Sequence, residues 1–320
     1  MLSRTADNLY WMARYTERAE NIARMLDVTY KMSFLPHHMS APQGFWGATL
    51  GITGLEEAFL AKYADQGGIT AQNVVRCMVL DLDNSSSILA SLKAARENAH
   101  AVRGTLTSET WETLNTTWIE ARTTNESQLQ GAELSKFFEW VKFRSHLSRG
   151  VTVGTMLQDE AFQFIRLGTF LERADNTARI LDVRYDELAP TSSGVADGDD
   201  NADYYEWGAL LRSVSAFEIY RKVYRDTITP ERVAELLILR REMPRSIAAC
   251  VSEVHTILRQ ISNNRSAETE RRAGAIHSRI QFGRIEDILQ VGLHHYLTEF
   301  LGSTADLGAR ISGDFLVSTN

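Results

Sequence analysis

The chain has 320 residues and carries 34 lysines and arginines against 41 aspartates and glutamates, which gives a net charge of −7 at neutral pH. This acidic balance argues against a duplex nucleic-acid-binding protein, because that class needs a basic face. No uninterrupted apolar run is long enough to span a bilayer, and because residues 1–4 lead into charged sequence we expect no secretory leader. With only two cysteines as well, we expect a cytoplasmic protein that does not bind membranes.

Helical periodicity dominates the chain, and strand signals are almost absent. The first predicted helix, at about 5–31, has one apolar stripe that includes Ile22 and Leu26, with a polar face opposite. A loop is predicted at 33–44. The acidic stretch at 191–203 predicts a mobile loop, and the last dozen residues are expected to fray. Further helices are predicted at about 46–63, 71–80, 85–104, 108–121, 132–150, 158–188, 205–225, 230–241, 245–262, 266–280 and 284–302.

The two halves of the chain resemble each other. The fourteen residues from Glu17 to Tyr30 align with those from Glu172 to Tyr185 with ten identities, and Trp46-Gly47-Ala48 recurs as Trp207-Gly208-Ala209. Matches at a nearly constant offset indicate an ancestral duplication. We therefore predict an all-α multi-helix bundle formed by two diverged tandem repeats, 1–155 and 156–320, packed as one compact body about a pseudo-twofold axis.

The residues shared between the copies include charged and polar side chains as well as apolar ones. Glu20 with Arg24 and Asp175 with Arg179 have the spacing of ordinary local ion pairs. Glu172, Arg173 and Arg18 have no opposite charge three or four residues away, and Glu17 has only Arg14. These side chains therefore need partners outside their own helix. The candidate network consists of Glu17, Glu172, Arg14, Arg18, Asn21, Arg24, Arg173, Asn176, Arg179 and Arg245.

Three interpretations of this network stay open. In the first, the Glu-Arg pairs bind each other reciprocally, Glu17 with Arg173 and Glu172 with Arg18, and hold the two copies in register. In the second, the charges form a solvated face. In the third, they line a ligand pocket in which arginines bind a carboxylate or phosphate and Glu17 or Glu172 is a candidate catalytic acid or base.

Other motifs point to little chemistry. Pro244-Arg245-Ser246 predicts a plain helix start, with an anion beside Arg245 as the alternative. The Glu97–His100 spacing lacks the further ligands of a di-iron site, and neither His37-His38 nor His294-His295 has converging ligands for zinc. Cys77 and Cys250 are expected to be buried, inert thiols. We predict no metal site and no cofactor.

The chain resembles the bacterial alpha-E domain family, an all-helical domain named for a Glu-Arg motif. The resemblance covers the whole chain in order and is carried by Leu2–Arg4, Trp11–Arg24, Ala95–Ala99, Leu167–Asp175 and Pro244–Ser246. Two positions depart from the family pattern: His100 stands where an arginine is expected, and Arg241–Met243 replaces an Asp-containing turn. The resemblance implies as partners a circularly permuted ATP-grasp ligase-like protein and a transglutaminase-like peptidase, with proteasome-like hydrolases as further companions.

Three functions follow as hypotheses. The first is an accessory protein of an ATP-grasp-type amide ligase, which positions the substrate or the ligase in peptide or protein-tag modification. The second is an enzyme that acts on a peptide-like amide or carboxylate ligand through the Glu-Arg helices. The third is a homo-oligomeric helical scaffold. Because the chain contains no complete catalytic motif, a non-catalytic role is favoured.

Overall fold

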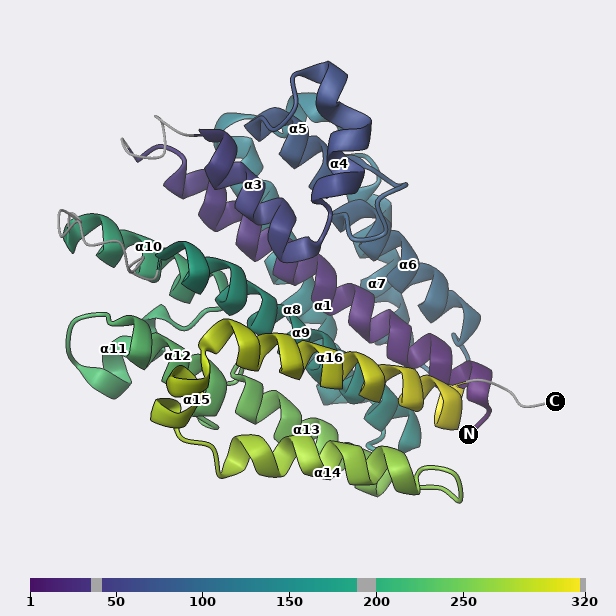
Figure 1. Ribbon diagram of the computed structural model, residues 1–320. Coiled ribbons are helices and arrows are strands. Elements are labelled where there is room, and N and C mark those ends of the chain that lie inside the picture. The colour runs from purple at the N-terminus through teal and green to yellow at the C-terminus, as the bar shows by residue number, and fades with distance from the viewer. Residues whose placement is uncertain (36–41, 189–199, 317–320) are drawn as a thin grey trace.

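A computed structural model describes residues 1–35, 42–188 and 200–316 (Figure 1). Within these ranges all regular secondary structure is helical, which confirms the predicted all-α class. His37 and His38, and most of the loop predicted at 191–203, lie outside the described residues.

Three helices in the first half of the chain begin at hydroxyl caps. The side-chain oxygens of Thr70, Ser87 and Thr107 accept hydrogen bonds from the backbone N–H three residues on, which satisfies a donor that a helix start leaves free. The elements are α1 (Ser3–Met32), α3 (Pro42–Thr53), α4 (Glu56–Tyr63), η1 (Ala64–Gln66), α5 (Ala71–Val75), the π-helical η2 (Arg76–Leu80), α6 (Ile88–Ala101), α7 (Ser108–Ala121), η3 (Glu126–Gln128) and α8 (Gly131–Thr155).

The second half follows the same rules. Thr229 caps a helix that has Pro230 in its first turn, and Ser246 caps the next by accepting from the Ala249 N–H. The elements are α9 (Glu160–Leu188), α10 (Asp200–Ser213), α11 (Phe217–Tyr224), α12 (Pro230–Leu239), α13 (Ile247–Gln260), α14 (Ala267–Gln281), α15 (Ile285–Val291), α16 (Leu293–Ile311) and the π-helical η4 (Ser312–Leu316).

Three predicted helices are each two helices, because the backbone turns left-handed inside them. The segment 46–63 is interrupted at Gly54 (φ 67°), 205–225 at Ser215 (φ 57°) and 284–302 at Gly292 (φ 100°). A left-handed residue ends a helix, and glycine adopts this conformation without a steric penalty. Ser215 gave no such signal in the sequence.

Two predictions about the loop and the chain end were wrong. The loop expected to continue to Asp203 ends earlier, since α10 begins at Asp200. Up to Leu316, where the described residues end, the chain does not fray: α16 runs to Ile311, and η4 buries Phe315 and Leu316 where it packs against α1.

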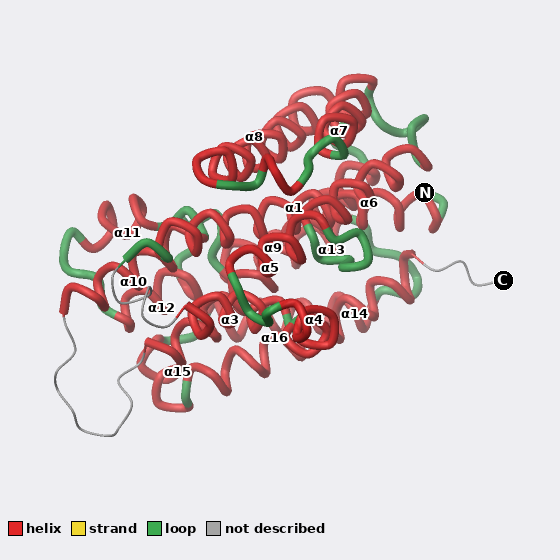
Figure 2. The backbone as a smooth tube through the Cα atoms, turned by 90° about the horizontal axis from the view of Figure 1, so that it is seen from above, coloured by secondary structure: helices red, strands yellow, loops and turns green. Residues whose placement is uncertain are grey.

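Helices α1 and α9 lie side by side at the centre and run in the same direction. The N-terminal amine contacts Glu160, Arg14 contacts Glu172, and Arg173 contacts Glu17. The residue number on α9 therefore rises together with that of its partner on α1, as it does in parallel helices. In Figure 2, α7 and α8 cover one side of this pair, and α3 and α16 lie on the other. The prediction that α1 packs along one apolar stripe was wrong, because Glu17, Glu20 and Asp27 of its polar face are also buried.

A glycine sets how closely the two central helices approach. Gly168 of α9 faces the backbone of α1, where an added Cβ would overlap the carbonyl oxygen of Tyr10 and lie 3.3 Å from the Cβ of Ala13. Only a residue without a side chain fits there. The short separation brings the glutamates and arginines of α1 and α9 within reach of one another.

The apolar core draws on both halves of the chain. Its larger cluster includes Trp46 and Leu50 from the first half together with Trp207 and Leu237 from the second. A second cluster at the other end of α1 and α9 contains Leu9, Leu167 and Ile257. The division into repeats at 1–155 and 156–320 stays a prediction.

Candidate ligand pocket beside a buried charge network

The two Glu-Arg pairs bind each other across the α1–α9 contact. Arg173 donates from Nε and Nη2 to the two carboxylate oxygens of Glu17 over 2.9 and 3.0 Å, and Arg18 donates in the same way to Glu172 over 2.6 and 3.1 Å. Both contacts have the two-pronged geometry that suits a guanidinium and a carboxylate. The structure therefore contains the reciprocal pairing of the first interpretation.

The Glu17 centre is a buried cluster that holds more arginines than glutamates, and Glu17, Arg149 and Arg173 also line a pocket of about 180 Å³. Glu17 and Glu20 are 1% and 0% exposed. Arg149 of α8 donates to Glu17 over 2.9 Å, and Arg24 donates to Glu20 over 2.8 Å. Arg245 binds both glutamates, with 2.8 Å to Glu17. Four arginines (Arg24, Arg149, Arg173 and Arg245) face two glutamates, which leaves two positive charges in excess.

These guanidiniums keep both glutamates ionised. Burial alone would raise the pKa of Glu17, but Arg173 and Arg245 reverse that effect and lower the pKa to about 2. Burial likewise opposes the ionisation of Glu20, and Arg245 and Arg149 hold its pKa well below the usual value. Both carboxyl groups therefore favour the ionised form near neutral pH.

Arg245 corrects one expectation from the sequence. Its position before a helix raised the alternative that it binds an anion at exposed backbone amides. In the structure its side chain is buried between Glu17, Glu20 and Asn21, and α13 begins two residues later at Ile247 with Ser246 as its cap. Arg245 is therefore an internal partner of the Glu17 centre.

The sequence prediction included Arg24 but missed other members of this cluster. Glu20 was interpreted only as the partner of Arg24 in an ordinary local ion pair, whereas it also accepts from Ser145 over 2.7 Å and binds Arg245. Arg149 was not singled out at all. Both Ser145 and Arg149 come from α8, and no spacing in the sequence indicates that α8 packs against this part of α1.

The Glu172 centre has a simpler set of partners. Arg14 donates from Nε to Glu172 over 2.7 Å and from Nη1 to the Tyr10 hydroxyl over 3.1 Å, while its guanidinium lies 4.9 Å from the centre of the Trp11 ring. Burial alone would raise the pKa of Glu172, but Arg14 and Arg18 reverse this and lower it. This carboxylate is thus fixed between two arginines.

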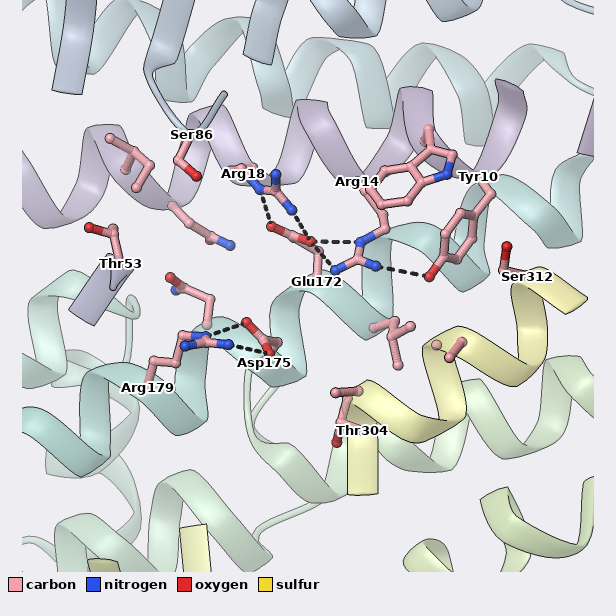
Figure 3. Close-up of a pocket in the computed structure, with 18 of the residues that line it drawn as sticks. Tyr10, Arg14, Arg18, Thr53, Ser86, Glu172, Asp175, Arg179, Thr304 and Ser312 are labelled. Carbon is pink, nitrogen blue, oxygen red and sulfur yellow. Dashed lines mark hydrogen bonds and ion pairs between the residues drawn. The ribbon is translucent and has the colours of Figure 1, made fainter. Parts of the chain in front are cut away.

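An open pocket lies directly beside the Glu172 centre (Figure 3). Its volume is about 510 Å³, which is within the range of small-molecule sites. Arg179 of α9 borders it and pairs with Asp175 over 2.7 Å. Three arginines (Arg14, Arg18 and Arg179) face two carboxylates (Glu172 and Asp175), so the pocket has one positive charge in excess.

Two asparagines at matching positions of the sequence copies also line this pocket. Asn21 is 3% exposed, and its amide Nδ2 is buried without a hydrogen-bond partner in the structure as described. Asn176 is half-buried and makes no side-chain hydrogen bond to any described residue. Buried polar groups are normally paired, so an unpaired donor at a pocket needs an explanation.

The two cysteines and the histidine pair His294-His295 are held by ordinary packing and side-chain contacts. Both cysteines are buried, as predicted, and burial raises the pKa of Cys250 to about 12.

His294 contacts Asp182 over 2.8 Å, and His295 contacts Glu299 over 3.5 Å. Over residues 1–35, 42–188 and 200–316 there is no group of three or more side chains that could hold a metal ion. In the same ranges no helix is long and apolar enough to cross a membrane.

The fold and the site together define an all-helical protein organised around paired Glu-Arg positions. The chain belongs to the Alpha-E family, described as a predicted alpha-helical domain with a conserved ER motif, whose model matches residues 1–316. Glu17-Arg18 and Glu172-Arg173 are the Glu-Arg sequences of this chain at its centre.

Relatives of the chain include uncharacterized proteins of Mycobacterium bovis and of two strains of Mycobacterium tuberculosis. Each is 25% identical over 316 residues, which cover 93% of this chain. The aligned part is only 35% of each relative, so the chain spans about a third of their length. No solved structure gives a significant match.

Proposed function

We propose that this chain is a non-catalytic accessory protein that holds an acidic, peptide-like ligand for a partner amide ligase of the ATP-grasp type. The observation that carries the proposal is the open pocket at Glu172, which has an excess of arginine while its carboxylates are already paired. Such a site favours the binding of an anion over the transfer of a proton.

The lowered pKa values weigh against the enzymatic alternative. A general acid or base is most effective when its pKa lies near the working pH. The pKa of Glu172 is lowered below its usual value, and that of Glu17 is about 2 in its arginine-rich cluster. Both side chains would stay ionised at neutral pH and bind their arginines, so they are poor candidates for acid–base chemistry.

Two observations support action with a second protein. In the mycobacterial relatives the matching region is about a third of a longer chain, so a similar unit there occurs beside further sequence. In this chain, α8 exposes Phe143 (64%) and Leu147 (36%), which lie one turn apart and so share a face of the helix. An exposed apolar patch is typical of a protein contact surface, and we assign that role to this face of α8.

The proposal can be tested by tagging the chain at its native expression level and identifying the proteins that copurify. We expect an ATP-grasp-type ligase, and a transglutaminase-like peptidase in the same fraction would extend the role to peptide or protein-tag modification. Phe143→Ser should reduce recovery of the ligase. Phe282→Ser is the matched control, because Phe282 is 77% exposed on the turn between α14 and α15.

A reconstituted reaction separates association from function. Adding the chain to the purified ligase should increase the rate of amide formation, and Arg179→Gln should remove that increase while copurification persists. Recovery of no ligase, together with an unchanged rate on addition of the chain, would refute the accessory role. Turnover of a peptide amide by the isolated chain would favour the enzymatic alternative instead.

A further inference from the structure

Two helix faces present hydrogen-bond donors to the same pocket. Arg18 and Asn21 are three residues apart on α1, and Asn176 and Arg179 are three residues apart on α9, so each pair lies on one face of its helix. All four side chains line the pocket of about 510 Å³ beside Glu172. The labelled arginines of this set are seen on opposite sides of that space in Figure 3.

The orientation of the Asn21 amide follows from its neighbour. Its Oδ1 accepts from Arg245 Nη1 over 3.0 Å. A guanidinium can only donate, so turning the amide over would place two donors against each other. Nδ2 is therefore the end of the Asn21 amide that is left to bind a ligand, and it is buried without a partner in the described part of the chain. An unsatisfied buried donor is costly, and an acceptor from a ligand would remove that cost.

The other three donors also have unused hydrogen-bonding capacity. Arg18 uses Nε and Nη2 on Glu172, and its Nη1 has no hydrogen-bond partner among the described residues. Arg179 binds Asp175 through Nε and Nη2, and its side chain is 43% exposed. Asn176 has no side-chain partner within the described ranges. These unused donors have no hydrogen-bond acceptor among the described residues, so a ligand could supply one.

The charge of the pocket selects the kind of anion. Three arginines against two carboxylates leave one positive charge to be neutralised. A carboxylate carries one negative charge and two acceptor oxygens, which matches this excess. A phosphate monoester carries nearly twice that charge at neutral pH and would leave the site negative.

The walls of the pocket indicate what is attached to the carboxylate. Ile22, Ile52 and Leu171 form apolar surface, and Ala305 and Leu316 continue it along α16 and η4. Hydroxyls of Thr53, Ser86, Thr304 and Ser312 stand around the same space (Figure 3). Apolar walls with a few hydroxyls suit a short peptide, whose side chains are apolar and whose amides form hydrogen bonds.

We infer that Arg18, Asn21, Asn176 and Arg179 form a carboxylate clamp, and that its ligand is a monoanionic organic acid of the peptide class, bound by its terminal carboxylate. Binding of this ligand class is inferred from the pocket itself, and only the use of the ligand by a partner ligase rests on the proposed function. The clamp is complete in the isolated chain, so it can be tested without any partner.

The test uses one probe in two forms, N-acetyl-alanyl-leucine with a free carboxylate and the same peptide as its carboxamide. Each is titrated into the purified chain by calorimetry, and the side-chain amides of Asn21 and Asn176 are followed by nuclear magnetic resonance. We expect the acid to bind at least about tenfold more tightly than the amide, because a charged hydrogen-bonded contact is lost. The two side-chain amide signals should shift with the acid alone.

Variants of the clamp sharpen this test. Arg179→Gln and Asn176→Ala should each weaken binding of the acid about tenfold while leaving binding of the amide and the melting temperature unchanged. Arg272→Gln is the matched control, because Arg272 is 44% exposed and forms an i,i+4 pair with Glu268, as Arg179 does with Asp175.

Three results would overturn the clamp: equal binding of acid and amide, no binding of the acid at millimolar concentration, or equal weakening by Arg272→Gln and Arg179→Gln. These outcomes are separable from the proposed function. Binding of the acid without recovery of a ligase refutes only the partnership. Recovery of a ligase without binding of the acid refutes the clamp and leaves the partnership standing.

Discussion

The Glu17 and Glu172 centres have the same Glu-Arg sequence and different surroundings. Glu17 lies in a larger cluster with Arg149 from α8 and Arg245 from the turn before α13, and it borders a pocket of about 180 Å³. Among the described residues Glu172 pairs with Arg14 and Arg18, and it borders a pocket of about 510 Å³. Residues that come from elsewhere in the chain therefore decide how many arginines surround a Glu-Arg pair. We assign stability to the first centre and ligand binding to the second.

The largest expected effect is the loss of the carboxylate at the Glu17 centre. Glu17→Gln leaves Arg173 buried without its counter-charge and takes from Arg245 one of its two carboxylates, so it should reduce the free energy of unfolding by about 3–5 kcal/mol. Glu172→Gln should cost only about 1–3 kcal/mol, because water in the pocket can solvate Arg14 and Arg18. Urea denaturation of both variants measures the difference. Equal losses would contradict the comparison.

The close approach of α1 and α9 supports both centres. Gly168→Ala should destabilise the protein by about 1–3 kcal/mol, because the new methyl group meets the Tyr10 backbone and forces the helices apart. Gly150→Ala is the matched control within a helix. Nothing lies within 4 Å of a Cβ at Gly150, so this change should stabilise α8 by about 0.5–1 kcal/mol. Thermal unfolding of both variants tests the pair; a neutral Gly168→Ala would mean that the contact is looser than described.

Charge reversal tests the reciprocal contact itself. Glu172→Arg should be strongly destabilising, and adding Arg18→Glu should recover part of the loss. Recovery stays incomplete because Arg14 also binds Glu172. In a double-mutant cycle we expect a coupling free energy of about 0.5–3 kcal/mol. Additive effects would show that the two side chains do not interact.

The dependence of stability on pH tests the Glu17 centre in a second way. The pKa of Glu17 is lowered from 4.5 to about 2 in the folded chain. A carboxyl group whose pKa is lower in the folded state stabilises that state above its unfolded pKa, and this contribution is lost as the pH falls from about 4.5 toward 2. Glu17→Gln should therefore show a flatter dependence of stability on pH over that interval. An unchanged slope, from denaturation at several pH values, would argue against the shift.

The sequence predicted the helical class well and the site only in part. Period and proline spacing located nearly every helix, and glycine marked two of the three unexpected breaks, whereas Ser215 carried no signal. The absence of local partners for Arg18 and Glu172 correctly indicated that they pair across helices. Arg149 could not be found, because its role depends on how α8 packs against α1. The pocket likewise depends on tertiary packing, since α16 and η4 form part of its wall.

The central claim is that Glu172 holds arginines beside a binding pocket and does not transfer protons. The most direct test is a carbon-13 nuclear magnetic resonance titration of the side-chain carboxyl of Glu172, assigned with Glu172→Gln. We predict that its pKa lies below the usual 4.5, because Arg14 and Arg18 outweigh the effect of burial. A pKa near neutrality would contradict the account and make Glu172 a candidate general acid or base.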